Sequence, residues 1–164
     1  MGIGQDQLNQ DSLDERFMGR ALELADRARS FGEVPVGALV VLGGEIIGEG
    51  YNQPIQTNDP TAHAEMVALR NAGDGLNNYR IVNATLYVTI EPCMMCVGAM
   101  VHSRISRLVY GADEPKAGAV NTHSLLGADW QNHKIEIQAG VRALECGKLM
   151  SDFFKQKREQ VVSD

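Results

Sequence analysis

Residues 84–96 read ATLYVTIEPCMMC, and this stretch decides which kind of fold the chain can form. Its first part is mostly apolar and rich in β-branched side chains, which is typical of a strand that is buried on both faces. Pro92 keeps the chain extended, and a short helix is expected from Cys93 to about His102. Cys93 and Cys96 stand three positions apart in that helix, so both sulfur atoms can point at a single atom.

The segments around this stretch predict further helices and strands. A capping box that begins at Ser12 predicts a first amphipathic helix. The runs 34–42 and 45–50 predict a hairpin, because the glycine pair between them can adopt positive φ without strain. The other expected elements are a helix that ends at Gly73, strands at 105–112 and 134–140, and a closing helix at 141–159. Such an order implies a mixed α/β sheet that is covered by helices on both faces.

Length and composition favour one ordinary globular domain. The chain has 164 residues, of which 44% are hydrophobic and 22% are charged. No apolar run approaches the roughly 20 residues that are needed to cross a bilayer, and the polar start lacks the apolar core of a secretion signal. An odd number of cysteines fits a reducing compartment better than a disulfide scaffold. The sequence therefore predicts a cytoplasmic protein without a membrane segment.

A metal ion is the natural partner of the two neighbouring cysteines. Zinc binds sulfur and imidazole ligands tetrahedrally, and a catalytic zinc site supplies three protein ligands and leaves one position open. His63 is the best third ligand, because it alone among the four histidines stands at the start of a predicted helix directly after a loop. Glu65 is two residues further on and does not share a helix face with His63. It is therefore better suited to take a proton from water that the metal activates.

Two other interpretations of the cysteines remain open. A cytosolic Cys-x-x-Cys can be a redox pair, although redox chemistry gives no reason for the upstream His-x-Glu. A closed structural zinc site would need a fourth protein ligand, and Cys146 is the one spare cysteine. Cys146 occupies an apolar position of the last predicted helix, where a free cysteine usually fills the core.

The pattern His-x-Glu, followed by Pro-Cys-x-x-Cys after a buried strand, resembles the signature of the zinc nucleobase deaminases. With the stretches VPVGALVV, GEGYNQP, DPTAHAEMVALR, VYGADEPKAGAV and SDFF, it is similar to the bacterial tRNA-specific adenosine deaminases over about residues 12–158. The resemblance implies a three-layer α/β/α sandwich of the cytidine-deaminase type with a mixed, about five-stranded sheet. It implies one Zn2+ per subunit, a homodimer, and conversion of the wobble adenosine in a tRNA anticodon loop to inosine.

The same resemblance divides the chain and assigns roles to residues. It implies a single deaminase domain over 12–158, with 1–11 expected as a disordered extension and 159–164 as a frayed end. It makes His63, Cys93 and Cys96 the zinc ligands and Glu65 the proton shuttle.

Substrate contacts are also implied, each with an open alternative. Asn52 matches the family's base-contacting asparagine, because an amide both donates to and accepts from a purine edge, although it could be only a turn residue. Glu114 stands where the family usually has an aspartate. It could still reach a substrate hydroxyl, or Asp113 next to it could substitute.

The charge of the chain limits how it can hold RNA. The formal net charge is -6, which argues against binding over the whole surface because Lys and Arg supply most of the affinity for phosphates. Lys155, Lys157 and Arg158 form a locally basic end and are expected to contact the tRNA anticodon stem-loop. On an exposed helix end they could equally be a solvated face.

Two alternatives to the implied function remain. One is a deaminase of a free base or nucleotide of the guanine, cytosine or deoxycytidylate type, and the other is a zinc-stabilised nucleic-acid-binding module without catalysis. The homodimer rests on the resemblance more than on residues. Val97, Met100 and Val101 could either face the sheet or form a subunit contact.

Overall fold

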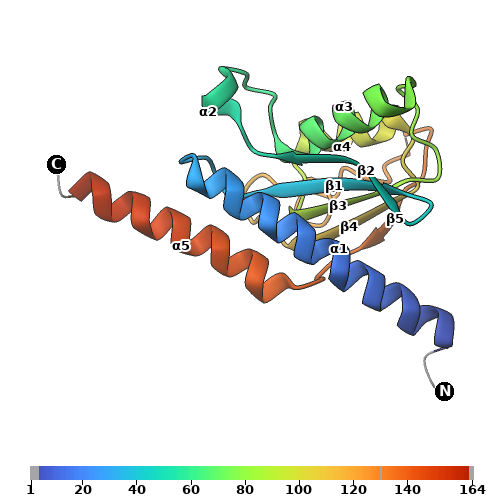
Figure 1. Cartoon of the computed structure of the whole chain (residues 1–164), viewed down its shortest axis with the longest axis horizontal. Coiled ribbons are helices and arrows are strands. Elements are labelled where there is room, and N and C mark those ends of the chain that lie inside the picture. Colours follow the sequence, from blue (N-terminus) through green and yellow to red (C-terminus); the bar gives the residue numbers. More distant parts are fainter. Residues whose placement is uncertain (1–3, 130, 163–164) are drawn as a thin grey trace.

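The computed structural model describes residues 4–129 and 131–162, which form five helices and five strands in a mixed order along the chain (Figure 1). The helices are α1 (Gln5–Ser30), α2 (Pro54–Thr57), α3 (Ala64–Leu76), α4 (Met94–Ser103) and α5 (Ala143–Val162). The strands are β1 (Gly37–Leu42), β2 (Glu45–Tyr51), β3 (Thr85–Ile90), β4 (Arg107–Ala112) and β5 (Glu136–Gln138). None of the helices in the described ranges has a stretch long and apolar enough to cross a bilayer.

The five strands form one mixed sheet in the order β2-β1-β3-β4-β5. β1 pairs antiparallel with both β2 and β3, whereas β3, β4 and β5 are parallel to one another. The expected hairpin is confirmed, and Gly43 and Gly44 form its turn with φ values of 59° and 82°. These positive angles favour glycine because it has no Cβ.

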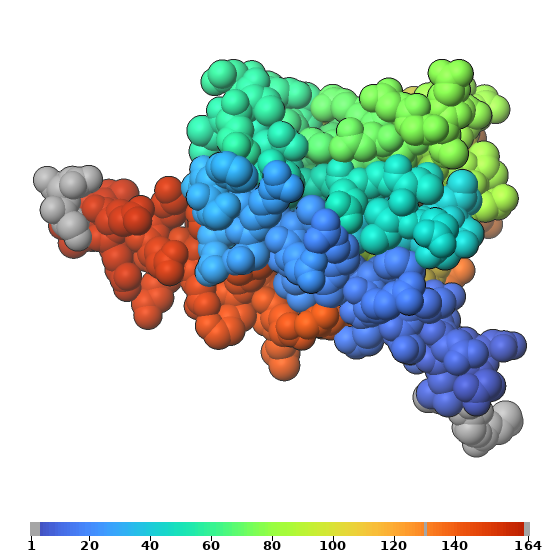
Figure 2. Space-filling model, viewed as in Figure 1, coloured from blue at the N-terminus to red at the C-terminus, as the bar shows by residue number. Residues whose placement is uncertain are grey.

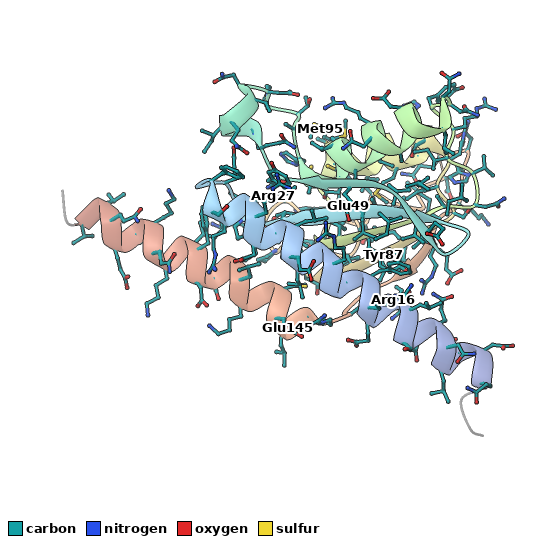
Figure 3. The ribbon with its side chains drawn as sticks, in the orientation of Figure 1. Arg16, Arg27, Glu49, Tyr87, Met95 and Glu145 are labelled. Atoms are coloured by element: carbon teal, nitrogen blue, oxygen red, sulfur yellow. The ribbon has the colours of Figure 1, made fainter. Side chains whose placement is uncertain are left out.

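Helices cover both faces of the sheet, as expected for a three-layer sandwich (Figure 1). Leu39 and Val41 point to the face that α1 and α5 cover, and Ala38 and Val40 point to the opposite face, which α3 and α4 cover. Tyr87 of β3, labelled in Figure 3, lies on the α1 side. This alternation is the period of two that a strand buried on both faces requires.

Two glycines bring the edge strand β2 close to α3. A Cβ added to Gly50 would collide with the backbone of Ala64 and Ala68, and one added to Gly48 would collide with the backbone one turn further along α3. Only residues without a side chain allow this approach. As a result, the loop that follows β2 begins beside the first turn of α3.

The ends of the first and last helices differ from the expectations. α1 begins at Gln5, so Ser12 lies inside the helix, and residues 5–11 are helical instead of a disordered extension. Gln7 donates 2.8 Å to Asp11 one turn later, a pairing that supports the extra turns. α5 continues to Val162, through four of the residues expected to fray. Residues 1–3 and 163–164 lie outside the described ranges.

Figure 2 shows the consequence for the shape of the molecule: the first turns of α1 and the last turns of α5 project from the body on opposite sides.

Two smaller differences from the expected elements concern the segment between β2 and β3. The short helix α2 was not predicted, and α3 ends at Leu76 instead of Gly73, because the left-handed residue that stops it is Asn77, with φ of 50°.

Candidate active site

Two helices begin at one end of the sheet and present three possible metal ligands to one point. His63 is the residue that precedes α3, and Cys93 is the residue that precedes α4. Cys96 follows in the first turn of α4, with Met95, labelled in Figure 3, beside it. Within the described residues these three form the one cluster of His, Cys, Asp or Glu that could hold a metal ion.

The distances among the three ligand atoms fit a zinc ion. His63 Nδ1 is 3.6 Å from Cys93 Sγ and 3.7 Å from Cys96 Sγ, and the two sulfur atoms are 3.8 Å apart. Tetrahedral zinc with Zn–S and Zn–N bonds of about 2.3 and 2.05 Å separates two sulfur ligands by about 3.8 Å and a sulfur from a nitrogen by about 3.6 Å. The donor set therefore has the chemistry and the spacing of three corners of a zinc site with one open corner.

The electrostatics of the two thiols also favour a bound cation. A hydrogen bond from Cys96 lowers the pKa of Cys93 to about 4, and His63 adds to this effect. The pKa of Cys96 is raised instead, first by its hydrogen bond to Cys93 and then by burial. Two thiolates so close together repel each other, so the second one forms readily only beside a positive ion.

Glu65 lies in the first turn of α3, next to the three possible metal ligands. It is only 4% exposed, although it carries a carboxyl group. Burial raises the pKa of Glu65 to about 7, while its own backbone N–H and the nearby His63 act in the opposite direction. A carboxyl group in this range can both take up and release a proton at neutral pH.

Asn52 lies in the loop after β2 and is joined to the start of α3. Its side-chain oxygen accepts a hydrogen bond of 2.8 Å from the backbone N–H of Ala64, and its side chain is largely buried. Its backbone N–H also donates to the carbonyl of Val36, at 3.0 Å. Asn52 is therefore more than a turn residue, and its side-chain NH2 group is the part that can donate to a ligand.

Sequence reasoning missed Glu91, which organises the loop 113–122 next to the metal cluster. The carboxylate is buried and accepts hydrogen bonds from the backbone N–H groups of residues 114, 120, 121 and 122 and from the hydroxyl of Thr122. Although burial opposes ionisation, the hydrogen bonds from Thr122 and its neighbours hold the pKa of Glu91 below its usual value. The available signal was an acidic residue between a buried strand and the Pro-Cys pair.

The candidate substrate residues Asp113 and Glu114 begin this loop. The Glu114 carboxylate accepts hydrogen bonds from the backbone N–H groups of Lys116 and Ala117, so it is turned toward its own loop. Asp113 accepts a hydrogen bond of 3.2 Å from the hydroxyl of Tyr110. Neither carboxylate belongs to the metal cluster.

A groove of about 550 Å³ separates this loop from α5. Glu114 and Lys116 line it on the loop side, and Phe154 and Arg158 line it on the helix side. Lys157 instead holds its ammonium 5.6 Å from the centre of the Phe153 ring, and Lys155 is exposed to solvent. Of the three basic residues singled out in the sequence, Arg158 is thus the one that borders the groove.

The remaining sequence candidates have structural roles. Cys146 is buried on the α1 side of the sheet, as expected for a core residue, where a Cβ on Gly111 would collide with its sulfur atom. Val97 and Met100 are buried against the sheet, which settles their orientation. His123 and His133 bond to backbone carbonyls at 2.8 and 2.6 Å.

Comparisons with known proteins agree with the geometry of the site. Residues 11–112 match the family described as the cytidine and deoxycytidylate deaminase zinc-binding region. This match and the His-Cys-Cys cluster assign the site to one zinc ion per chain.

Individual relatives indicate which group within this family the chain resembles most. A tRNA-specific adenosine deaminase from Haemophilus influenzae is 51% identical over 150 residues, which cover 90% of this chain and 87% of that protein. A solved structure from work on A-to-I editing by tRNA:A34 deaminases aligns with a TM-score of 0.80 at 39% identity, covering 82% of this chain and 98% of that one. A guanine deaminase from Nitrosomonas europaea, at 24% identity and a TM-score of 0.69 over 85% of this chain and 83% of that one, shares the fold alone. The chain therefore belongs to the tRNA-specific adenosine deaminases, within the cytidine and deoxycytidylate deaminase family.

Proposed function

We propose that this chain converts adenosine to inosine at the wobble position of a tRNA anticodon loop by zinc-dependent hydrolysis. The observation that carries the proposal is the triangle of His63, Cys93 and Cys96 with the buried Glu65 behind it. Three ligands with one open corner are the arrangement of a catalytic zinc site, whereas a structural site is closed by a fourth ligand. The 51% identity to a tRNA-specific adenosine deaminase supports tRNA as the source of the adenosine.

The reaction adds water to C6 of the adenine and releases ammonia. When bound, the zinc ion supplies Lewis-acid chemistry that lowers the pKa of water at its open position to about 7. Glu65 takes the proton that this water loses and delivers it to the purine ring nitrogen next to C6. Glu65 then takes the second proton from the hydroxyl group now on C6 and passes it to the amino group, which leaves as ammonia.

The substrate base must leave any stack to expose C6, as an unpaired anticodon base can. The side-chain NH2 group of Asn52 is suited to donate to an acceptor on this base, because its oxygen is already used by Ala64. The groove between the loop 113–122 and α5 is suited to the neighbouring nucleotides. Arg158 and Lys116 offer cations to phosphates there, and Phe154 offers an aromatic face for stacking.

Two further properties belong to this proposal. The enzyme acts as a homodimer, as the family resemblance implies, and sedimentation at micromolar concentration tests it against a 17.9 kDa monomer. It works in the cytoplasm, where a reducing environment keeps its three cysteines as the free thiols that the structure contains.

The decisive experiment separates tRNA from small substrates. Zinc-loaded protein is incubated with unmodified tRNA and, separately, with free guanine, cytosine and deoxycytidylate, and inosine and ammonia are assayed. We expect inosine in tRNA and no ammonia from the small molecules. Ammonia from a free base or nucleotide without inosine in tRNA would make the chain a small-molecule deaminase. Absence of any product would make it a zinc-stabilised binding module.

A further inference from the structure

The carboxylate of Glu91 is an unusual group to find between a strand and a metal ligand. Glu91 is 2% exposed, and among the described residues no positively charged side chain is hydrogen-bonded to it. Five donors converge on its two oxygen atoms: four backbone N–H groups and the Thr122 hydroxyl, at 2.8 to 3.2 Å. Only an ionised carboxylate accepts on both oxygens at once, because an amide of the same size places a donor at one of them.

The loop 113–122, whose backbone donates to Glu91, is also bonded directly to Pro92 and to the possible metal ligand Cys93. Ala119 donates 2.8 Å to the carbonyl of Pro92, and Gly118 forms an isolated antiparallel bridge with Cys93. A Cβ on Gly118 would collide with the Glu91 carboxylate, so the loop backbone rests against this group. Glu91 thus holds the loop to the two residues that follow it in sequence, and the second of these is a metal ligand.

We propose that Glu91 is a positioning residue that fixes the loop 113–122 as a wall of the substrate groove at a set position relative to Cys93. The proposal rests on the proposed function, because it is the substrate that uses this wall. Glu91 does not touch the substrate itself. Its carboxylate holds the backbone of Glu114 at the start of this wall, so it acts on substrate binding more than on the chemical step.

The test is the isosteric variant Glu91→Gln of the zinc-loaded protein. We expect one zinc per chain to remain, and KM for tRNA to rise about tenfold or more, the size expected when a hydrogen-bond set to a charged group is lost. We expect kcat to fall less than KM rises. Amide hydrogen exchange of residues 120–122 should rise about tenfold or more, because these N–H groups donate to the Glu91 carboxylate and lose that acceptor.

A second variant and a matched control complete the test. Gly118→Ala leaves Glu91 in place but presses on its carboxylate from the loop side, so it should reproduce the rise in KM and in exchange even where Glu91→Gln does not fold. Glu33→Gln is the control, because Glu33 is equally buried and accepts a hydrogen bond of 2.8 Å from the backbone N–H of Gln56 in α2. It should leave KM for tRNA and the exchange of residues 120–122 unchanged.

The outcomes distinguish this inference from the proposed function. Wild-type KM and wild-type exchange in Glu91→Gln would overturn the positioning role, and so would loss of zinc, because the carboxylate would then support the metal site itself. If the unaltered protein made no inosine in tRNA, the proposed function would fail. The exchange and zinc measurements would still decide whether Glu91 holds the loop.

Discussion

The side-chain oxygen of Asn52 accepts a 2.8 Å hydrogen bond from the backbone N–H of Ala64, the first residue of the helix that carries Glu65. One half of this amide therefore supports the start of α3, and the NH2 half is the part that we propose donates to a bound base. The support and the proposed contact with substrate can be separated, because only the oxygen is needed for the first and only the NH2 group for the second.

Asn52→Asp should keep stability and lose substrate binding. An aspartate still accepts from Ala64, and its negative charge is favourable at a helix N-terminus, so the free energy of unfolding should stay near that of the wild type. It lacks the donating NH2 group, so KM for tRNA should rise about tenfold, as for one lost hydrogen bond of about 1.4 kcal/mol. Urea unfolding and steady-state kinetics measure the two effects.

Asn52→Ala is the matched variant, because it loses both halves of the amide. It should show the same rise in KM together with a loss of about 1 kcal/mol in the free energy of unfolding. An Asn52→Asp enzyme with wild-type KM would show that this residue supports α3 and does not contact the base.

Glu65→Gln should retain one zinc per chain and lose turnover. The amide fills the same buried space but cannot take a proton, and general acid–base catalysis typically contributes about 100-fold or more to the rate. Zinc content by atomic absorption and inosine formation at saturating tRNA measure the two properties. Glu49→Gln is the control, because that carboxylate pairs with Arg20 at 2.7 Å outside the metal cluster. Full turnover in Glu65→Gln would rule out the proton-shuttle role.

Local sequence patterns predicted those features that depend on neighbours in the chain. The hairpin at Gly43-Gly44, the buried strand β3 and the pairing of two cysteines on α4 each follow from a short stretch, and the structure contains all of them. The position of His63 at a helix start was predictable for the same reason. These are also the features that place the metal cluster.

Features that depend on contacts distant in sequence were not predicted. The Glu91 carboxylate accepts hydrogen bonds from residues as far away as Thr122, 31 positions along the chain. The residues next to Glu91 in the sequence do not indicate these bonds. Asp14 meets Arg107 across 93 positions. The start of α1 was placed too late for a different reason: Ser12 has the side chain of a helix cap, but residues further upstream can also be helical, and a capping signal does not exclude them.

Asp14 should make the protein less stable at low pH. It is buried and accepts two hydrogen bonds of 2.8 Å from Arg107 and one of 2.8 Å from Tyr87. Burial alone would raise the pKa of Asp14, but the hydrogen bonds from Arg107, Tyr87 and Gln10 together hold it below the ordinary value of 3.8. A lowered native pKa means that Asp14 stabilises the fold fully above about pH 4 and that this contribution is lost as the pH falls through the native pKa.

Asp14→Asn measures this contribution. At pH 7 it should lower the free energy of unfolding by about 3 kcal/mol, because it leaves the mostly buried Arg107 without its main partner. The difference from the wild type should shrink as the pH falls below about 4, because Asp14 then binds a proton in the unfolded state that it does not bind in the native state. Glu136→Gln is the control, because Glu136 is an exposed partner of the same arginine and should cost less than about 1 kcal/mol. A difference that is constant from pH 7 to pH 3 would contradict the account.

The basic end of α5 offers the test of how an acidic protein holds RNA. Lys155, Lys157 and Arg158 carry three positive charges on one exposed helix end, in a chain whose formal net charge is -6. If they contact phosphates of the anticodon stem-loop, each contact releases counterions. Replacing all three by Ala should then weaken tRNA binding at low salt and reduce the slope of log affinity against log salt by about 2, taking about 0.7 per single-stranded contact.

The structure indicates that the three basic residues contribute unequally to RNA binding. Arg158 lines the groove beside Glu114, whereas Lys157 lies over Phe153 and Lys155 faces solvent. Arg158→Ala alone should therefore account for the largest share of the lost affinity, and zinc content and turnover at saturating tRNA should stay near wild type. Lys148→Ala is the control on the same helix, because Lys148 is paired with Asp152 one turn away. An unchanged affinity and slope in the triple variant would assign this helix end to solvent and direct the search for the RNA surface to Lys116 on the opposite wall of the groove.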